Sequence, residues 1–204
     1  MLYVASTSGR VTAISIKALP FSIVWQCEFG VPVFGSLSVS SPSGNVICCL
    51  VDGHVIALDP SGSIIWTVVT GGPLFAGACT SYVIPSQEGG HLLWQYDVGE
   101  PITSSAYVDE NMQLSDPSPL ADRLACICGS SGSIYLLQIN SNATTYGNQQ
   151  VKELVDPMVQ EFAHMNLLGD IFSSPVMIGG RIYVGCRDDY LHCIGVEAKV
   201  SIKK

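Results

Sequence analysis

Two adjacent cysteines, Cys48 and Cys49, are the residues whose spacing most directly suggests redox chemistry, because neighbouring thiols can form a disulfide. They lie in the apolar run at residues 46–51, which has the length of a β-strand. Neighbours on a strand point to opposite faces of the sheet. We therefore interpret both cysteines as small apolar residues of a buried strand.

Metal-ligating residue types lie close together near the C-terminus, at Cys186, His192 and Cys193. On a hairpin, His192 and Cys193 face opposite ways, and no Cys-x-x-Cys pair lies nearby. The sequence therefore predicts no metal site. Two other histidines, His54 and His91, lie at or near expected strand starts and are interpreted as exposed turn residues.

Motifs for hydrolysis or phosphate binding are absent: there is no Gly-x-Ser-x-Gly elbow, phosphate-binding glycine loop or metalloprotease motif. Residues 129–133, Gly-Ser-Ser-Gly-Ser, have the spacing of a hairpin turn. Asp59 stands at the head of a turn, where a carboxylate caps the backbone. We predict no catalytic residue, no bound cofactor and no enzymatic activity in this chain.

The composition excludes some classes of partner. The net charge is −8 with only nine Lys and Arg, which disfavours nucleic acid and anionic membranes. No apolar run is long enough to span a membrane, and no secretion signal is recognisable at the start. We therefore expect a cytoplasmic protein in which the glycosylation sequon at Asn142 is unused. Cysteines within apolar runs are expected to be reduced and buried, namely Cys27, Cys48, Cys79, Cys126, Cys128 and Cys193.

The elements that position these residues belong to a repeat. Residues 59–62, Asp-Pro-Ser-Gly, fit a type I turn, and β-branched apolar runs at 54–58 and 64–69 flank it as the arms of a hairpin. A Trp-x4-Gly spacing recurs, with Pro two residues after each Gly. These pairs are Trp25 and Gly30, Trp66 and Gly71, and Trp94 and Gly99. A degraded copy places His164 and Gly169 at the Trp and Gly positions. We predict that each large ring packs one sheet on the next, beside a Gly that lets a neighbouring backbone approach.

The period of the repeat predicts the fold. Gly30 and Gly71 are 41 residues apart, which is typical of a four-stranded propeller blade. Gly71 and Gly99 are only 28 apart, so the third repeat lacks its central hairpin. We predict an all-β, partial β-propeller of four-stranded antiparallel blades in a single domain, 1–204, with four to five repeats. The expected repeats are 1–35, 36–76, 77–104, 105–174 and 175–204.

Apolar runs separated by turn residues predict the strands. Residues 151–168 are ambiguous between a short helix and strands, and we favour strands at the two ends of this segment. The expected strands are 2–5, 11–16, 23–28, 36–40, 46–50, 54–58, 64–69, 77–84, 92–96, 104–108, 124–128, 133–139, 182–185 and 191–196.

Ala57, Asp59, Gly62 and Trp66 together resemble the tryptophan-docking motif of the pyrroloquinoline-quinone-type β-propellers, one residue shorter at the turn than the commonest form. Within that superfamily, four segments are similar to the C-terminal propeller of the β-alanine-activating, aminoadipate-semialdehyde-dehydrogenase-like acyl-activating enzymes. They are Val-Phe-Gly-Ser at 33–36, His-Leu-Leu-Trp-Gln-Tyr-Asp-Val-Gly at 91–99, Ile-Phe-Ser-Ser-Pro at 171–175 and Val-Gly-Cys-Arg-Asp-Asp-Tyr at 184–190.

The resemblance implies a function. In that family an AMP-forming adenylation domain and a phosphopantetheine carrier domain precede the propeller, and neither is found in these 204 residues. The chain would then be the last few blades of such a protein, a non-catalytic interaction module whose partner is another protein or the rest of a larger parent chain. Exposed apolar surface is expected at the open ends.

Two other functions stay open at this point. One is a quinone-dependent dehydrogenase, motivated by the docking motif and by Cys48 and Cys49, since an adjacent-cysteine disulfide packs against the cofactor in quinoprotein dehydrogenases. The calcium ligands and catalytic Asp of those enzymes cannot be assigned to residues of this sequence. The other is a free-standing scaffold propeller like that of the bacterial outer-membrane assembly machinery, which would require an export signal.

Overall fold

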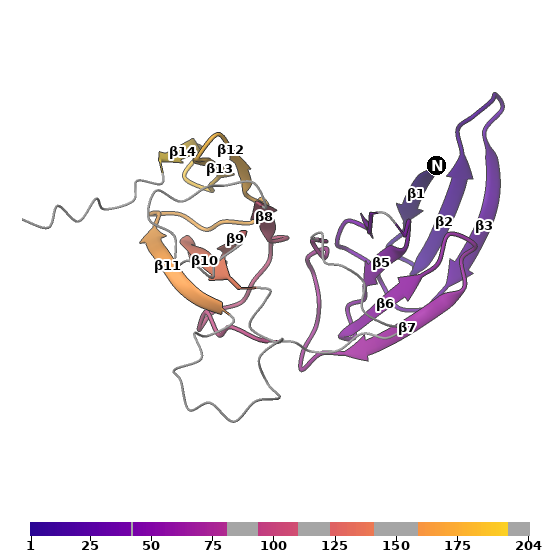
Figure 1. Cartoon of the computed structure of the whole chain (residues 1–204), viewed down its shortest axis with the longest axis horizontal. Coiled ribbons are helices and arrows are strands. Elements are labelled where there is room, and N and C mark those ends of the chain that lie inside the picture. The colour runs from indigo at the N-terminus through magenta and orange to yellow at the C-terminus, as the bar shows by residue number, and fades with distance from the viewer. Residues whose placement is uncertain (42, 81–93, 110–122, 141–158, 196–204) are drawn as a thin grey trace, which may run out of the picture. The chain divides into compact units, whose positions relative to one another are not determined.

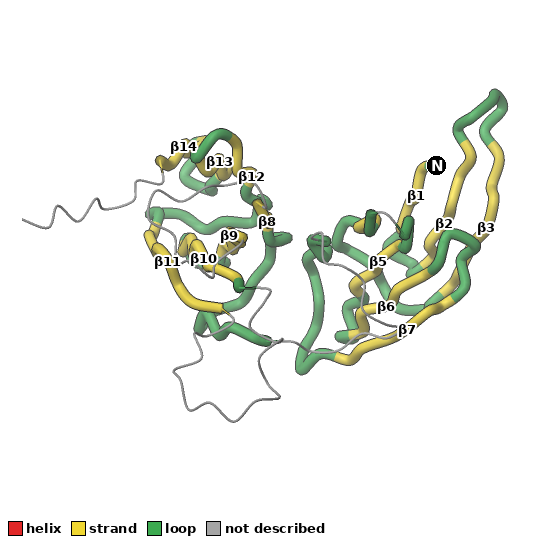
Figure 2. Tube along the Cα trace, viewed as in Figure 1, coloured by secondary structure: helices red, strands yellow, loops and turns green. Residues whose placement is uncertain are grey.

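The computed structural model describes residues 1–41, 43–80, 94–109, 123–140 and 159–195. These residues form strands, turns and loops, and none of them is helical (Figures 1 and 2). No helix that could cross a membrane occurs in this described part of the chain. The chain divides into two compact units, Met1–Leu92 and Leu93–Lys204, and each is described by itself.

The first unit contains two antiparallel sheets. The first sheet has the order β1 (Leu2–Ala5), β2 (Arg10–Ser15), β3 (Ser22–Glu28). The second sheet has the order β4 (Ser38–Val39), β5 (Val46–Cys49), β6 (His54–Leu58), β7 (Ile64–Val69). Strands adjacent in sequence are adjacent in each sheet, as in a meander.

The second unit repeats this arrangement. The third sheet has the order β8 (Tyr107–Asp109), β9 (Arg123–Cys128), β10 (Ser133–Ile139), β11 (Val159–Asn166). The fourth sheet has the order β12 (Val176–Ile178), β13 (Arg181–Gly185), β14 (Leu191–Gly195).

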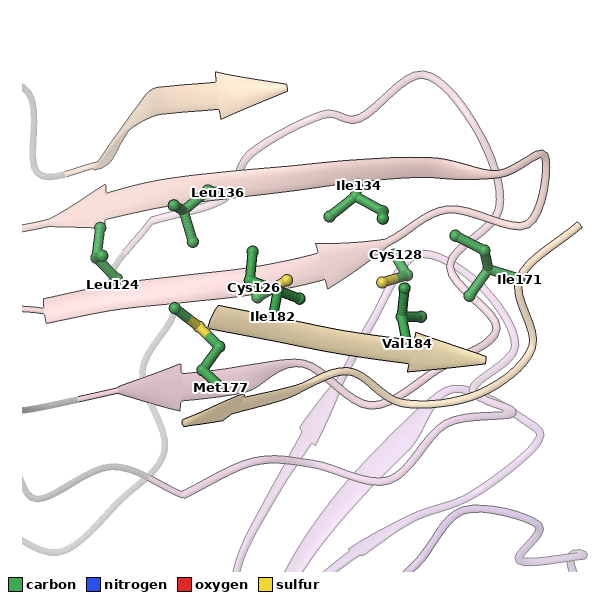
Figure 3. Close-up of a cluster of buried hydrophobic side chains, with 9 residues drawn as sticks. All are labelled: Leu124, Cys126, Cys128, Ile134, Leu136, Ile171, Met177, Ile182 and Val184. Atoms are coloured by element: carbon green, nitrogen blue, oxygen red, sulfur yellow. The ribbon is translucent and has the colours of Figure 1, made fainter. Parts of the chain in front are cut away.

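Each unit buries an apolar cluster contributed by both of its sheets. In the first unit the cluster joins Val11 of β2 to Val46, Cys48, Ile56 and Leu58 of the second sheet. In the second unit, nine buried side chains of the two sheets and of the link between them point toward one another (Figure 3). These are Leu124, Cys126, Cys128, Ile134, Leu136, Ile171, Met177, Ile182 and Val184. Packing of one sheet on the next, rather than a single central core, therefore stabilises each unit.

A β-bulge recurs at one register position in three sheets. It follows the pairs Ala13 with Trp25 and Ala57 with Trp66, and in the third sheet it follows the pair Leu136 with Ala163. The bulge adds one residue to the outer strand and increases its twist. The three outer strands, β3, β7 and β11, are therefore structurally equivalent.

This equivalence corrects the expected register of the fourth sequence copy. Ala163, not His164, occupies the position of Trp25 and Trp66. His164 lies one residue further on, where its ring stacks on Tyr135 at 4.5 Å between centroids. The prediction used the Gly that follows as its landmark, and that landmark is displaced by one residue in this copy.

Most of the strand predictions are confirmed to within two residues at each end, and the strand expected at the end of 151–168 is β11. β12 was not predicted. Expected strands 77–84 and 92–96 lie partly outside the described residues, and their described parts, 77–80 and 94–96, are not strands. Of the described residues between β7 and β8, Ile102 forms an isolated bridge with Gly129. The predicted loss of a hairpin in the third repeat concerns residues 77–104, which lie partly outside the described residues.

Candidate functional site

Trp25 docks the first sheet onto the second. Its indole Nε1 donates a hydrogen bond to the carbonyl oxygen of Pro60 at 2.9 Å. Its ring lies over Gly62, where an added Cβ would be 2.7 Å from the indole Cδ2. Gly62 also has a φ of +90°, which disfavours any residue with a Cβ. The structure thus brings together Trp25 and Gly62, two of the residues predicted from the repeat.

Trp25 packs on the turn at residues 59–62, which we call the docking turn, and Asp59 stabilises the conformation of this turn. Its Oδ1 accepts hydrogen bonds from the backbone N–H groups of Ser61 at 2.8 Å and Ser63 at 2.9 Å, and from the Ser61 hydroxyl at 2.6 Å. The hydroxyl and the Ser63 N–H lower the pKa of Asp59 because they stabilise its ionised form. Asp59 therefore has the backbone-capping role expected from its place in the turn.

The other predicted tryptophans have different surroundings. Trp66 is half-buried and pairs with Ala57 across β6 and β7. Trp94 is also half-buried, and the residues after it lie against the third sheet. There, Tyr96 donates a hydrogen bond to Glu161 of β11 at 2.7 Å. The segment that begins at Trp94 thus contacts an outer strand of the second unit.

One hydrogen bond recurs between successive repeats. In each case, the carbonyl oxygen of a residue in the link that precedes a sheet accepts a hydrogen bond from an N–H in the central turn of that sheet. The three pairs are Pro32 with Val51 at 3.1 Å, Pro101 with Ser130 at 2.9 Å and Asp170 with Arg187 at 2.9 Å. This docking bond, as we call it, places Pro32 and Pro101 at equivalent positions, as their spacing from Trp predicts.

Glu100 reinforces the middle docking bond. Its Oε2 accepts hydrogen bonds from the N–H of Ser131 at 2.7 Å and from the Ser131 hydroxyl at 2.5 Å. Burial acts to raise the pKa of Glu100, but these bonds outweigh it and the pKa is lowered. Glu100 therefore anchors the link to the third sheet, a role that no sequence pattern indicates.

The glycines that follow the tryptophans do not have the predicted role. Apart from its chain neighbours, a Cβ at Gly30, Gly71 or Gly99 would meet no atom of the described residues within 4 Å, so no described backbone segment approaches these glycines. Gly30 and Gly99 instead have φ values of +68° and +73°, which favour glycine. Close backbone contacts occur at other glycines. Gly35 lies against the backbone of Ala76 and Gly77, and Gly77 lies against the backbone of Ser36.

The outward face of the first sheet exposes apolar side chains. Leu2 and Val4 of β1 are 47% and 44% exposed, and Ile23 of β3 lies in the same cross-strand row as Leu2. The opposite face of this sheet contributes Val11 to the buried cluster. The first sheet is therefore covered on one face and open on the other.

The fourth sheet is open in the same way. Met177, Ile182 and Val184 point into the buried cluster, while Ile178 and Leu191 are 64% and 74% exposed on the other face. We call these two surfaces, around Leu2 and Val4 and around Ile178 and Leu191, the open faces. Exposed apolar surfaces of this kind mark interaction sites.

The links between sheets also expose aromatic rings. Phe34 and Phe75, at equivalent positions after Pro32 and Pro73, stack at 6.2 Å between centroids and are both about half exposed. In the second unit Phe172 has the corresponding position, and the Arg187 guanidinium lies 5.4 Å from its ring centroid. Both contacts are surface features of the links.

The adjacent cysteines are buried thiols. Cys48 and Cys49 are both free and buried in β5. Burial, followed by the nearby thiols of Cys49 and Cys27, raises the pKa of Cys48 to about 12. Because the thiolate is the reactive form, Cys48 is chemically inert at neutral pH. All eight cysteines are free, but Cys79 and Cys193 are exposed, contrary to the prediction that they are buried.

His192 and Cys193 point to opposite faces of β14, as predicted. The structure instead brings His192 together with Cys186 and Asp188. Asp188 was not among the metal ligands considered from the sequence. The signal available was the spacing Cys-x-Asp-x3-His around a tight turn. Of the remaining candidates, His54 is half-buried beside Asp52, whereas His91 and Asn142 lie outside the described residues.

Comparison with known proteins gives two kinds of likeness. No protein-family model matches the chain. The chain is 26% identical to beta-alanine-activating enzyme of Danio rerio over an aligned segment of 156 residues, which is 76% of this chain. It is 24% identical to beta-alanine-activating enzyme of Homo sapiens over 121 residues, which is 59% of this chain. The chain matches only 9% of the length of either relative.

Among solved structures, the chain is similar to BamB from Moraxella catarrhalis, with a TM-score of 0.63 and 20% identity over 94% of this chain and 54% of that chain. This likeness shows the fold, and the four sheets are blades of a β-propeller. The chain is a β-propeller module with weak sequence similarity to beta-alanine-activating enzyme.

Proposed function

We propose that this chain is a non-catalytic interaction module, and that its two open faces receive further blades of an acyl-activating protein related to beta-alanine-activating enzyme. The observation that carries the proposal is the exposure of Leu2, Val4, Ile178 and Leu191 on sheets whose other faces are buried. A propeller blade buries its faces only against neighbours, so an uncovered face favours association.

A further blade fits these surfaces better than a small ligand does. In each unit, a sheet of the same kind already covers the inner face with rows of aliphatic side chains. The chain also matches only 54% of the BamB chain and 9% of the curated relatives, so similar proteins have additional chain that could supply blades.

The rival function of a quinone-dependent dehydrogenase finds no support in the cysteine pair. Cys48 and Cys49 are buried free thiols, and Cys48 packs in the apolar cluster between two sheets. As part of the same proposal we place the protein in the cytoplasm, where free cysteines such as the exposed Cys79 and Cys193 stay reduced.

Sedimentation velocity tests the association. We expect the average mass of the wild-type chain to rise with concentration, because burying the open faces removes apolar surface from water. The substitution Val4→Lys together with Ile178→Lys places a charge on each open face and should abolish the rise.

The control adds positive charge elsewhere. Thr7→Lys changes an exposed turn residue, so this variant should associate as the wild type does. A wild-type chain that stays monomeric at every concentration, or a Thr7→Lys variant that dissociates equally, would refute the role of the open faces.

A further inference from the structure

Three side chains of metal-ligating type converge at the turn between β13 and β14. The Cys186 Sγ, an Asp188 carboxylate oxygen and a His192 ring nitrogen all lie within 4.8 Å of one another. Cys186 follows β13, Asp188 lies in the turn and His192 lies on β14. All three are half-buried, so the cluster is held by the sheet and remains open to solvent on one side.

The carboxylate is already oriented toward the other two groups. The Tyr190 N–H donates to Asp188 Oδ1 at 3.1 Å, while Asp188 Oδ2 lies 2.9 Å from His192 Nε2. Burial acts to raise the pKa of Asp188, but hydrogen bonds from His192, from the Tyr190 N–H and from the Cys186 thiol outweigh it, and the pKa is lowered. Both oxygens of the carboxylate are thus oriented by hydrogen-bond contacts, with Oδ2 facing His192.

The thiol is also held in place. Cys186 packs partly against the buried cluster, and its Sγ would lie 2.9 Å from a Cβ added to Gly169. A larger residue at position 169 would therefore push the sulfur out of the site. The absence of a side chain at Gly169 leaves room for the thiol next to Asp188.

The turn does not need these residues to fold. The pairs Gly185 with Leu191, Ala5 with Val11, Cys49 with Val55 and Cys128 with Ile134 define the equivalent turns of the four sheets. At the positions of Cys186, Asp188 and His192, the other sheets have Ser6, Ser8 and Thr12; Leu50, Asp52 and Ile56; and Gly129, Ser131 and Tyr135. At these three positions, a thiol, a carboxylate and an imidazole occur together only in the fourth sheet among the four described turns.

We propose that Cys186, Asp188 and His192 form a binding site for a zinc-class divalent metal ion, with Sγ, Oδ2 and Nε2 as its ligands. Tetrahedral zinc with bonds of about 2.0 to 2.3 Å holds its ligand atoms about 3.3 to 3.8 Å apart, so small side-chain rotations suffice. A thiolate with an imidazole selects zinc or cobalt over calcium and magnesium. The solvent-exposed side provides the fourth position for water. The metal displaces the proton of the Cys186 thiol, which is released to solvent, and the neutral imidazole ligates through Nε2 with its proton on Nδ1.

Cobalt titration of the full, reduced chain tests the site, because a Co²⁺–thiolate bond has its own charge-transfer absorption. We expect this band to saturate at one equivalent and to disappear when Zn²⁺ displaces the cobalt. Cys186→Ser should abolish the band, and His192→Gln should weaken cobalt binding at least about tenfold.

Two matched controls keep the test specific. Cys193→Ser removes an exposed thiol next to His192 but on the other face of β14, and should leave the band unchanged. His54→Gln removes the imidazole that lies 3.0 Å from Asp52 in the second sheet's turn, which has Leu50 at the position of Cys186, and should also have no effect. Absence of the band in the wild type, or its survival in Cys186→Ser, would show that Asp188 and His192 only stabilise the turn.

Discussion

Replacing Trp25 with alanine is expected to lower the free energy of unfolding of the first unit by about 3 to 5 kcal/mol, as for other large-to-small changes at packed aromatic sites. The substitution removes the ring from Gly62 and the Nε1 hydrogen bond to Pro60, and so separates the first sheet from the docking turn of the second. Urea unfolding followed by circular dichroism measures the loss without relying on tryptophan fluorescence.

Trp66→Ala is the matched control for this prediction. Trp66 has the same register on its own sheet, but no described residue forms a docking turn for it. Both rings are half-buried, so the difference is the hydrogen bond and the turn contact of Trp25, and for Trp66 we expect a smaller cost of about 1 kcal/mol. Equal costs for the two tryptophans would mean that docking on the turn contributes nothing beyond burial of the ring.

Gly35→Ala is expected to have the second largest effect. A Cβ at Gly35 would lie 2.3 to 2.5 Å from backbone atoms of Ala76 and Gly77, and a Cβ at Gly77 would lie 2.3 Å from the carbonyl oxygen of Ser36. Because backbone atoms on both sides must move, we expect a loss at the upper end of the overpacking range, about 3 kcal/mol.

Gly71→Ala provides the comparison, because a Cβ there meets nothing within 4 Å and no positive φ is required. Its effect should lie within about 0.5 kcal/mol of zero. Thermal unfolding of both variants measures the difference. A Gly35→Ala variant as stable as Gly71→Ala would contradict the close contact between residues 35–36 and 76–77.

The repeat made much of the fold predictable. The turn at residues 59–62 and the strands His54–Leu58 and Ile64–Val69 follow from local chemistry: Asp and Gly at the positions a type I turn requires, between β-branched apolar runs. The recurrence of that pattern at a blade-sized period then predicted sheets that pack on one another. The buried role of Cys48 followed from the same strand assignment.

The remaining features depend on contacts between segments far apart in sequence. The role of Gly35 is set by residues 76–77, and nothing near Gly35 in sequence signals it. The predicted register of β11 was wrong because Ala163 occupies the Trp position, which left only the Gly that follows, displaced by one residue, as a landmark. Asp188 was not predicted as a ligand because a carboxylate in a turn usually caps the backbone. Its position next to Cys186 and His192 depends on the turn that brings the ends of β13 and β14 together.

The central claim is that the same docking bond joins the second, third and fourth sheets to the links that precede them, and backbone amide hydrogen exchange resolved by NMR tests it most directly. The N–H groups of Val51, Ser130 and Arg187 each donate to the link that precedes their sheet. We predict that these three exchange at least about tenfold more slowly than solvent-exposed turn amides of the same chain, since exchange requires each link to separate locally from its sheet. Exchange of all three at the rate of exposed turn amides would contradict the docking of the links on the sheets that follow them.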